Sequence, residues 1–417
     1  MKKIIVSAVV AAMALSTTAS ALEDIKVSGQ AKLWYETWNK GDNDIFDKYA
    51  SQAEVVFKLG VTGKQGNVGF GAEYTQGSTM GVENMLVMGT RTGANTLTQQ
   101  LGAGEDGYVS KAYITAPIAP DTIIKMGRQE LNTPFAFTEK WNAQQNNFDA
   151  LVAINSSVKN LTLIGAYVGQ TNTAISSGAP AWKAQANFEQ LHGGAFAAGA
   201  LYKNDMLAVN GWLYSVRDYM NTQILTEITG GGVVDNIHAE AAWLDAKVSV
   251  AGANITGIVA HMAPSADLDS TTGFAVAADY SVAGIKLFAA GSSVGEGVLP
   301  LGNVATNFKK TKLPTAGVYT DGLFVAQPEA TAFKVKASGK LGSTGLALQA
   351  VMNTSDNAAT EGADENTKDT TEVDLIISQK VGDFNLKGIL MHRSFADDAT
   401  DDAAGGQHVR VIASVNF

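Results

Sequence analysis

Apolar and polar residues alternate with a period of two along much of the chain, and this pattern restricts the possible folds more than any other feature. The last segment shows it most plainly, with apolar residues at every second position: Val409, Val411, Ala413, Val415 and Phe417. The same period recurs at 25–36, 53–62 and 68–74. Successive side chains of a strand point to opposite faces, so each segment predicts a β-strand between an apolar and a polar medium. We find no convincing helical period after residue 21.

About eighteen such segments can be counted, although sixteen strands remain possible because several alternate weakly. Short connectors, such as 63–67 and 246–247, alternate with long ones, such as 131–146 and 295–330. This order places all long loops at one end of an up-and-down meander, as in bacterial outer-membrane barrels. Lipid cannot hydrogen-bond an unpaired strand edge, so the sheet must close. We therefore expect an all-β, antiparallel transmembrane barrel and disfavour a soluble sandwich.

The N-terminal residues 1–21 have the parts of a secretory signal peptide. A basic start at residues 2–3 precedes an apolar run over 4–15 and small residues up to Ala21. The run is too short to cross a bilayer as a helix. We expect cleavage after Ala21 and a barrel over 22–417.

Composition excludes several functional classes. The chain has no cysteine, which excludes a disulfide scaffold, a cysteine-ligated metal and a thiol nucleophile. With 40 acidic against 30 basic residues, the net charge of −10 argues against nucleic acid as a partner. Ser293 has the spacing of a nucleophile elbow but closes a predicted strand, so we expect no enzyme activity and no catalytic residue.

Two further features resemble known proteins. Phe417 ends an alternating strand and resembles the signal by which the barrel-assembly machinery selects its clients. The segment 123–134 reads IIKMGRQELNTP and is followed by TEKWN at 138–142 and NFDA at 147–150. Together these segments resemble the Campylobacter-type major outer-membrane porin family, which is distantly related to OprD-type porins.

The resemblance implies an 18-stranded, homotrimeric, water-filled barrel with its third outer loop folded into the lumen. In the outer membrane we expect such a barrel to contact lipid and lipopolysaccharide. Members of the family favour cations, and some hold calcium near the constriction. The calcium ligands of the family find no match in this sequence, so no residues are assigned to a metal site. Calcium binding is therefore expected from the resemblance alone, and a channel of this kind requires no cofactor.

The best candidate for the inward loop is 131–146. Glu130 and Glu139 are expected to form a negative rim, with Asp149 pointing inward and with Arg128 and Lys140 facing them. Such a constriction creates a transverse field, and carboxylates there favour cations. The alternative is that these charges lie in solvated loops or pair structurally.

Three arginines, Arg217, Arg393 and Arg410, fall near strand positions and are candidates for the pore wall. An arginine that faces lipid at the membrane midplane costs ~2–4 kcal/mol, so we expect them to point inward.

The sequence therefore predicts an outer-membrane porin for passive diffusion of ions and small hydrophilic solutes. Removing Lys2 and Lys3 leaves 28 basic against 40 acidic residues, a net charge of −12, which favours cations. The alternative is a structural or adhesive surface barrel with little conductance.

Overall fold

The computed structural model describes residues 22–39, 43–78, 85–87, 107–172, 189–217, 238–265, 268–306, 308–355, 369–395 and 406–417. The expected signal peptide lies outside the described residues. Among the residues that are described, no helix is both long enough and apolar enough to cross a bilayer.

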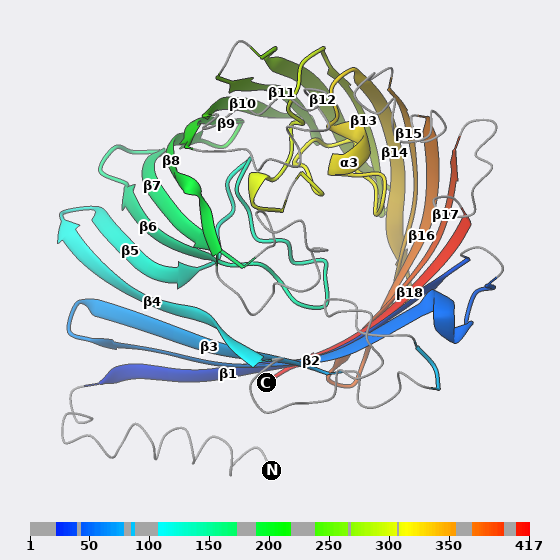
Figure 1. Ribbon diagram of the computed structural model, residues 1–417, viewed down its shortest axis with the longest axis horizontal. Helices are drawn as coiled ribbons and strands as arrows, with labels where there is room; N and C mark the ends of the chain where they lie inside the picture. Colours follow the sequence, from blue (N-terminus) through cyan, green and yellow to red (C-terminus); the bar gives the residue numbers. More distant parts are fainter. Residues whose placement is uncertain are drawn as a thin grey trace.

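Eighteen β-strands within these ranges form a single closed antiparallel sheet, in which each strand pairs with the next along the chain (Figure 1). The strands are β1 (Glu23–Trp38), β2 (Ser51–Gln65), β3 (Val68–Ser78), β4 (Gly107–Ala119), β5 (Thr122–Gln129), β6 (Phe148–Asn155), β7 (Leu161–Thr171), β8 (Glu189–Lys203), β9 (Leu207–Val216), β10 (Ala239–Val250), β11 (Ala253–Pro264), β12 (Thr271–Val282), β13 (Ile285–Val294), β14 (Ala330–Leu341), β15 (Thr344–Ser355), β16 (Thr370–Val381), β17 (Phe384–Phe395) and β18 (Gly406–Asn416). The sheet closes where β1 pairs with β18, from Gln30 opposite Asn416 to Trp38 opposite His408. The predicted fold class is confirmed.

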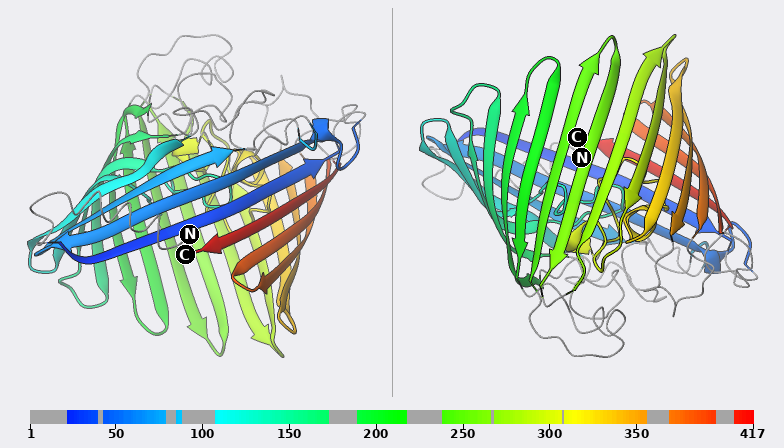
Figure 2. Two further views of the ribbon diagram at one scale, coloured as in Figure 1. Left: turned by 90° about the horizontal axis from the view of Figure 1, so that it is seen from below. Right: turned by 90° about the horizontal axis from the view of Figure 1, so that it is seen from above.

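The two faces of the sheet differ as the alternation requires. On β14, Phe333 and Val335 face outward and are 57% and 58% exposed. Lys334 and Lys336, which alternate with them along the strand, face the lumen. Large exposed apolar side chains surround the barrel: Leu33, Ile114, Met126, Leu151, Leu213, Leu244, Phe274, Val276, Leu348, Met352 and Leu390. Figure 2 shows the strands inclined to the barrel axis, as closure of such a sheet requires.

The short connections lie at one end of the barrel, which we call the turn end, and the long connections lie at the opposite, loop end. Between β10 and β11 the chain turns at Ala251 and Gly252, whose φ angles are 49° and 80°. Positive φ at both central residues gives the twist that two-residue hairpins favour. The turn predicted at 246–247 is therefore wrong, because β10 continues through these residues to Val250.

The C-terminal residue completes the seam between β18 and β1. The backbone of Phe417 exchanges two hydrogen bonds with Gly29, of 2.7 and 3.0 Å, and its ring stacks on Phe57 with centroids 5.9 Å apart. A Cβ atom at Gly29 would lie 2.2 Å from the Phe417 ring. Glycine at this position lets the terminal ring lie flat against the outer surface.

Candidate solute channel

Two long connections fold into the barrel instead of extending away from it. Figure 1 shows both within the ring of strands, one between β5 and β6 and one between β13 and β14, where it carries the short helix α3 (Gly322–Val325). We call residues 130–147 loop 3 and residues 295–329 loop 7, by their order among the long connections. The sequence predicted the inward course of loop 3 but not that of loop 7.

The two loops are bonded to each other inside the lumen. The backbone amide of Val304 donates to the carbonyl of Phe135 at 2.9 Å. The side chain of Asn303 both accepts from the amide of Phe137, at 3.3 Å, and donates to its carbonyl, at 2.9 Å. Residues more than 160 positions apart in the chain thus form one folded unit, which narrows the lumen.

One side of the lumen, formed by the inner faces of β6–β13, is packed with apolar groups and is called the apolar side. Phe135 of loop 3 lies edge-on to Tyr214 and Trp243, with centroids 5.5 and 5.6 Å apart. Buried residues of both loops and of the wall join this cluster: Leu131, Phe148, Val152, Trp212, Met262, Leu299, Leu301 and Leu313. Water is therefore displaced from the barrel along this wall.

The remaining wall, formed by the inner faces of β14–β18 and β1–β5, is called the charged side. Its lumen-facing cations include Lys32, Lys58, Lys111, Lys125, Lys334, Lys336, Lys387, Arg393 and Arg410, and its carboxylates include Glu36, Glu54, Glu73, Glu372 and Asp374. Strand parity places them together, as with Lys334 and Lys336, which are two residues apart. Several of these groups are buried against loops 3 and 7, among them Glu54, Glu372 and Arg410, whereas Lys334 and Lys336 are only partly buried.

Glu130 and Lys140 come together at the start of loop 3, but they pair with each other. Glu130 contacts Lys140 at 2.5 Å and Lys111 at 2.6 Å, and it accepts from Gln145 at 2.8 Å. Partial burial acts to raise its pKa, yet the hydrogen bonds and charges of these lysines lower the pKa of Glu130 to about 2. The carboxylate is ionised and neutralised locally.

Loop 3 is also held by the wall beneath it. Lys32 donates to the carbonyls of Asn142 and Ala143, at 3.2 and 3.1 Å. Farther along, Lys58 donates to Gln145 at 2.9 Å. Gln144 in turn donates to Glu54 of β2 at 2.5 Å. These wall charges position the loop.

Glu139 does not form part of a rim. Its side chain is only 4% exposed and accepts hydrogen bonds from Asn303, at 3.1 Å, and from Thr306. Burial raises the pKa of Glu139, although both donors and Lys310 act in the opposite direction. The structure thus corrects the expected role, because Glu139 joins loop 3 to loop 7.

Arg128 and Asp149 do not face the lumen, contrary to expectation. They alternate with the buried, inward-facing Gln129 and Phe148 and share the outer face with Met126. The guanidinium of Arg128 donates to both oxygens of Asp149, at 2.8 and 3.0 Å. The pair lies on the outer surface near the loop end. The inward position is taken instead by Phe148, which is buried in the apolar cluster with residues of both inward loops.

The three candidate wall arginines have two different positions. Arg410 lies in the lumen, 4.6 Å above the ring of Trp34, and donates to Glu36 at 3.0 Å and to the hydroxyl of Tyr319 of loop 7 at 2.7 Å. Arg393 also faces the lumen, over the ring of Phe395 at 5.0 Å.

Arg217 is the exception among them. It follows β9 on the outer face, 5.6 Å from the ring of Phe196, which is itself exposed on the outer surface. The expectation that it lines the pore is corrected.

A carboxylate that the sequence did not suggest anchors loop 7. Glu372 of β16 accepts hydrogen bonds from the backbone amides of residues 318, 319 and 320, at distances from 2.5 to 3.2 Å. Its side chain is fully buried. Lys334 donates to the carbonyl of Ala316 on the same loop. The alternation of inward and outward residues along β16 could have placed Glu372 in the lumen. No residue near it in the sequence indicates that it binds the backbone of loop 7.

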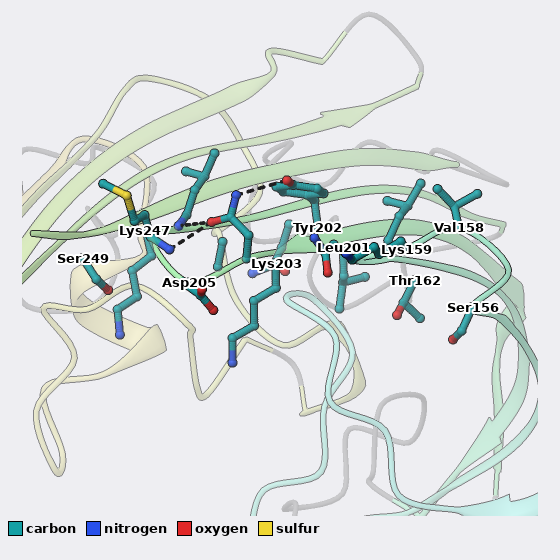
Figure 3. Close-up of a pocket in the computed structure, with 17 residues that line it drawn as sticks. Ser156, Val158, Lys159, Thr162, Leu201, Tyr202, Lys203, Asp205, Lys247 and Ser249 are labelled. Carbon is teal, nitrogen blue, oxygen red and sulfur yellow. Dashed lines mark hydrogen bonds between the residues drawn. The ribbon is translucent and has the colours of Figure 1, made fainter.

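At the turn end the lumen opens beside a recess of about 720 Å³ (Figure 3). Lys203 and Lys247 extend in the same direction there, and Lys159 belongs to the adjacent turn. The turn between β8 and β9 is closed by Asn204, whose side chain accepts from the amides of Met206 and Leu207, at 2.9 and 2.8 Å. The turn end of the apolar side therefore also carries cationic side chains.

Within the described ranges, no group of three or more histidine, aspartate or glutamate side chains is placed to hold a metal ion. The calcium and the homotrimer implied by the resemblance stay predictions.

No family model and no curated protein matches the chain. Several solved structures do match its fold. Pseudomonas aeruginosa OpdK with vanillate has a TM-score of 0.67 at 10% identity, and P. aeruginosa OccK2 (OpdF) in complex with glucuronate has 0.62 at 12%. Acinetobacter baumannii OccAB2 has 0.65 at 11%. Each match covers 94% of this chain and 98% of the other.

These similarities establish a shared fold, an 18-stranded barrel like that of the Occ channels. The sequence resemblance to OprD-type porins is thus supported at the level of the fold, whereas the Campylobacter-type assignment stays a prediction.

Proposed function

We propose that the chain forms a channel in the bacterial outer membrane through which small hydrophilic solutes diffuse. The observation that carries the proposal is the contrast between an apolar outer band and a lumen wall of lysine, arginine and carboxylate side chains. A barrel of 16–18 strands is wide enough to hold water, and loops 3 and 7 narrow it along one side. Diffusion requires no catalytic group, only a radius and an electric field.

The solutes that this channel favours carry a carboxylate. Lys125, Lys336 and Lys387 line the charged side, and such rings and rows of cations favour anions. The similar structures include one with vanillate and one with glucuronate, which are both carboxylates. The expected cation preference depended on net charge and on Glu130 and Glu139, but both of these carboxylates are engaged within or between the loops.

Planar-bilayer recording of the purified chain tests both points. We expect stable conductance steps and a reversal potential, across a potassium chloride gradient, that indicates anion preference. Glucuronate added on one side should reduce the chloride current as it enters the same passage. Cation preference would contradict the carboxylate proposal and restore the earlier expectation. A failure to conduct in any condition would favour the structural or adhesive barrel instead.

A further inference from the structure

The outer surface is not uniform around the barrel. Near the loop end, four outward-facing charged groups lie between β5 and the start of β10: Arg128, Asp149, Arg217 and Glu240. On the other described strands, the outward positions at this level carry uncharged residues such as Thr331, Thr354 and Thr371. Charge on a lipid-facing surface is costly, so these groups are more stable when they contact a polar partner.

A groove of about 790 Å³ lies on this same side of the barrel, across the outer faces of β6–β11. Its floor consists of small residues, including Gly165, Ala198 and Ala242, and larger apolar side chains flank it. Tyr167 and Phe196 contact each other at 5.1 Å on one flank. The small floor and tall flanks form a recess that an acyl chain can fill.

Polar groups gather at the end of the groove nearest the loops. Ser215 and Glu240 are direct partners in the pairing of β9 with β10. His261 lies on the next strand, with its Nδ1 atom 2.8 Å from the hydroxyl of Thr272. Arg217 lies just beyond Ser215, against the ring of Phe196. The guanidinium of Arg128 is already bound by Asp149, whereas Arg217 lies beside the groove with its guanidinium over the ring of Phe196.

We infer that the groove binds one phosphorylated glycolipid of the outer leaflet, the lipid A part of lipopolysaccharide. An acyl chain fills the recess over Gly165, the phosphate contacts Arg217, and sugar hydroxyl and amide groups donate to Glu240 and Ser215. Arg217, Glu240 and Ser215 together suit a sugar phosphate better than they suit inorganic phosphate. Glu240 repels a bare anion but accepts hydrogen bonds from a sugar. The inference depends on the proposed membrane location but not on the solute that passes through the lumen.

The test is a titration of the detergent-purified, delipidated full chain with lipid A, followed by native mass spectrometry. The wild type should retain one lipid A molecule. Arg217→Gln should weaken binding roughly tenfold or more, since it removes a charged hydrogen-bond partner, and Arg217→Lys should restore most of it. Gly165→Leu should also weaken binding, because its side chain enters the recess.

Gly388→Leu is the matched control for the groove. Gly165 and Gly388 both lie on outer faces, and a Cβ atom at either meets nothing within 4 Å. Only Gly165 lines the groove, so Gly388→Leu should bind lipid A as the wild type does.

Three results would overturn the inference. The first is that Arg217→Gln and Gly165→Leu each bind lipid A as tightly as the wild type does. The second is that the wild type binds lipid A without phosphates as tightly as intact lipid A, and the third is cross-linking of a second copy over the groove. Conductance of the same preparations is recorded separately. A conducting wild type that retains no lipid A would refute the lipid site alone, and lipid retention without conductance would refute the channel alone.

Discussion

The apolar and charged sides of the lumen belong to one sheet, yet they hold the inward loops in different ways. On the apolar side, Phe135 is inserted between Tyr214 and Trp243 in a dry cluster. On the charged side, the carboxylate of Glu372 binds successive backbone amides of loop 7. Apolar packing attaches loop 3 by excluding water. Hydrogen bonding to Glu372 attaches loop 7 at a wall that also carries charged residues such as Lys334.

This difference indicates where solutes can pass. Some wall lysines hold the loops, as Lys32 and Lys58 do. Others, such as Lys336 and Lys387, remain on the charged side of the lumen. The loops are therefore fastened to both sides of the barrel, and under the proposed function the solute path follows the wall lysines that do not hold a loop.

The largest expected effect comes from the apolar side. Phe135→Ala should destabilise the folded barrel by about 3–5 kcal/mol, because it leaves a cavity between two aromatic rings. The temperature at which the barrel unfolds in detergent measures this loss. Phe333→Ala is the control, since Phe333 faces outward, and it should change stability far less. Equal losses would show that loop 3 is not packed against the wall.

On the charged side, Glu372→Gln should weaken the attachment of loop 7 by about 2–3 kcal/mol, since the amide accepts less strongly than a carboxylate. Limited proteolysis within 308–328 should become faster, and current noise should increase. Asp245→Asn is the control, since Asp245 faces the lumen from β10 and accepts from Asn210 and Trp243 of the wall. An unchanged cleavage rate in Glu372→Gln would contradict the anchoring role.

The two glutamates of loop 3 should give opposite pH dependences. The pKa of Glu139 is raised by burial, so between its usual value of 4.5 and the raised value the folded state binds more protons, and stability falls as pH rises. The pKa of Glu130 is lowered to about 2, so stability is lost as pH falls from 4.5 toward that value.

Thermal unfolding from about pH 2 to about pH 7 checks both signs. Glu139→Gln should remove the decline above pH 4.5, and Glu130→Gln should remove part of the acid loss. Identical profiles in the wild type and both variants would contradict the assignment of these environments.

The smallest expected effect is on ion preference. Lys336→Glu should shift the permeability ratio toward cations by about two- to fivefold, because two unit charges about 4 Å apart in water interact by about 1 kcal/mol. Lys286→Glu is the matched control, since Lys286 lies on β13 and pairs with Asp279 at 3.1 Å. A larger shift in the control would place the ion path on the other side of the lumen.

Much of the fold followed from local pattern. Period-two alternation identified the strands, and the order of short and long connectors predicted their up-and-down closure. The turn predicted at 246–247 was wrong because β10 continues to Val250, and Asp245 and Lys247 both point into the lumen from this strand.

The site was less predictable because its contacts are not local. Nothing near Glu372 in the sequence indicates that residues 318–320 bind it, and loop 7 has no motif that predicts an inward course. The placement of Asp149 failed for a related reason. Alternation tells which residues share a face, but it does not tell which parts of the lumen are filled by a loop.

The most direct test of the water path uses cysteines introduced into this cysteine-free chain. Current through Lys336→Cys, on the charged side, is recorded while a charged thiol reagent is added, and Met262→Cys, on the apolar side, is recorded in the same way. The account predicts a stepwise loss of current in Lys336→Cys and no change in Met262→Cys, whose position is only 1% exposed. Block through Met262→Cys with none through Lys336→Cys would contradict it.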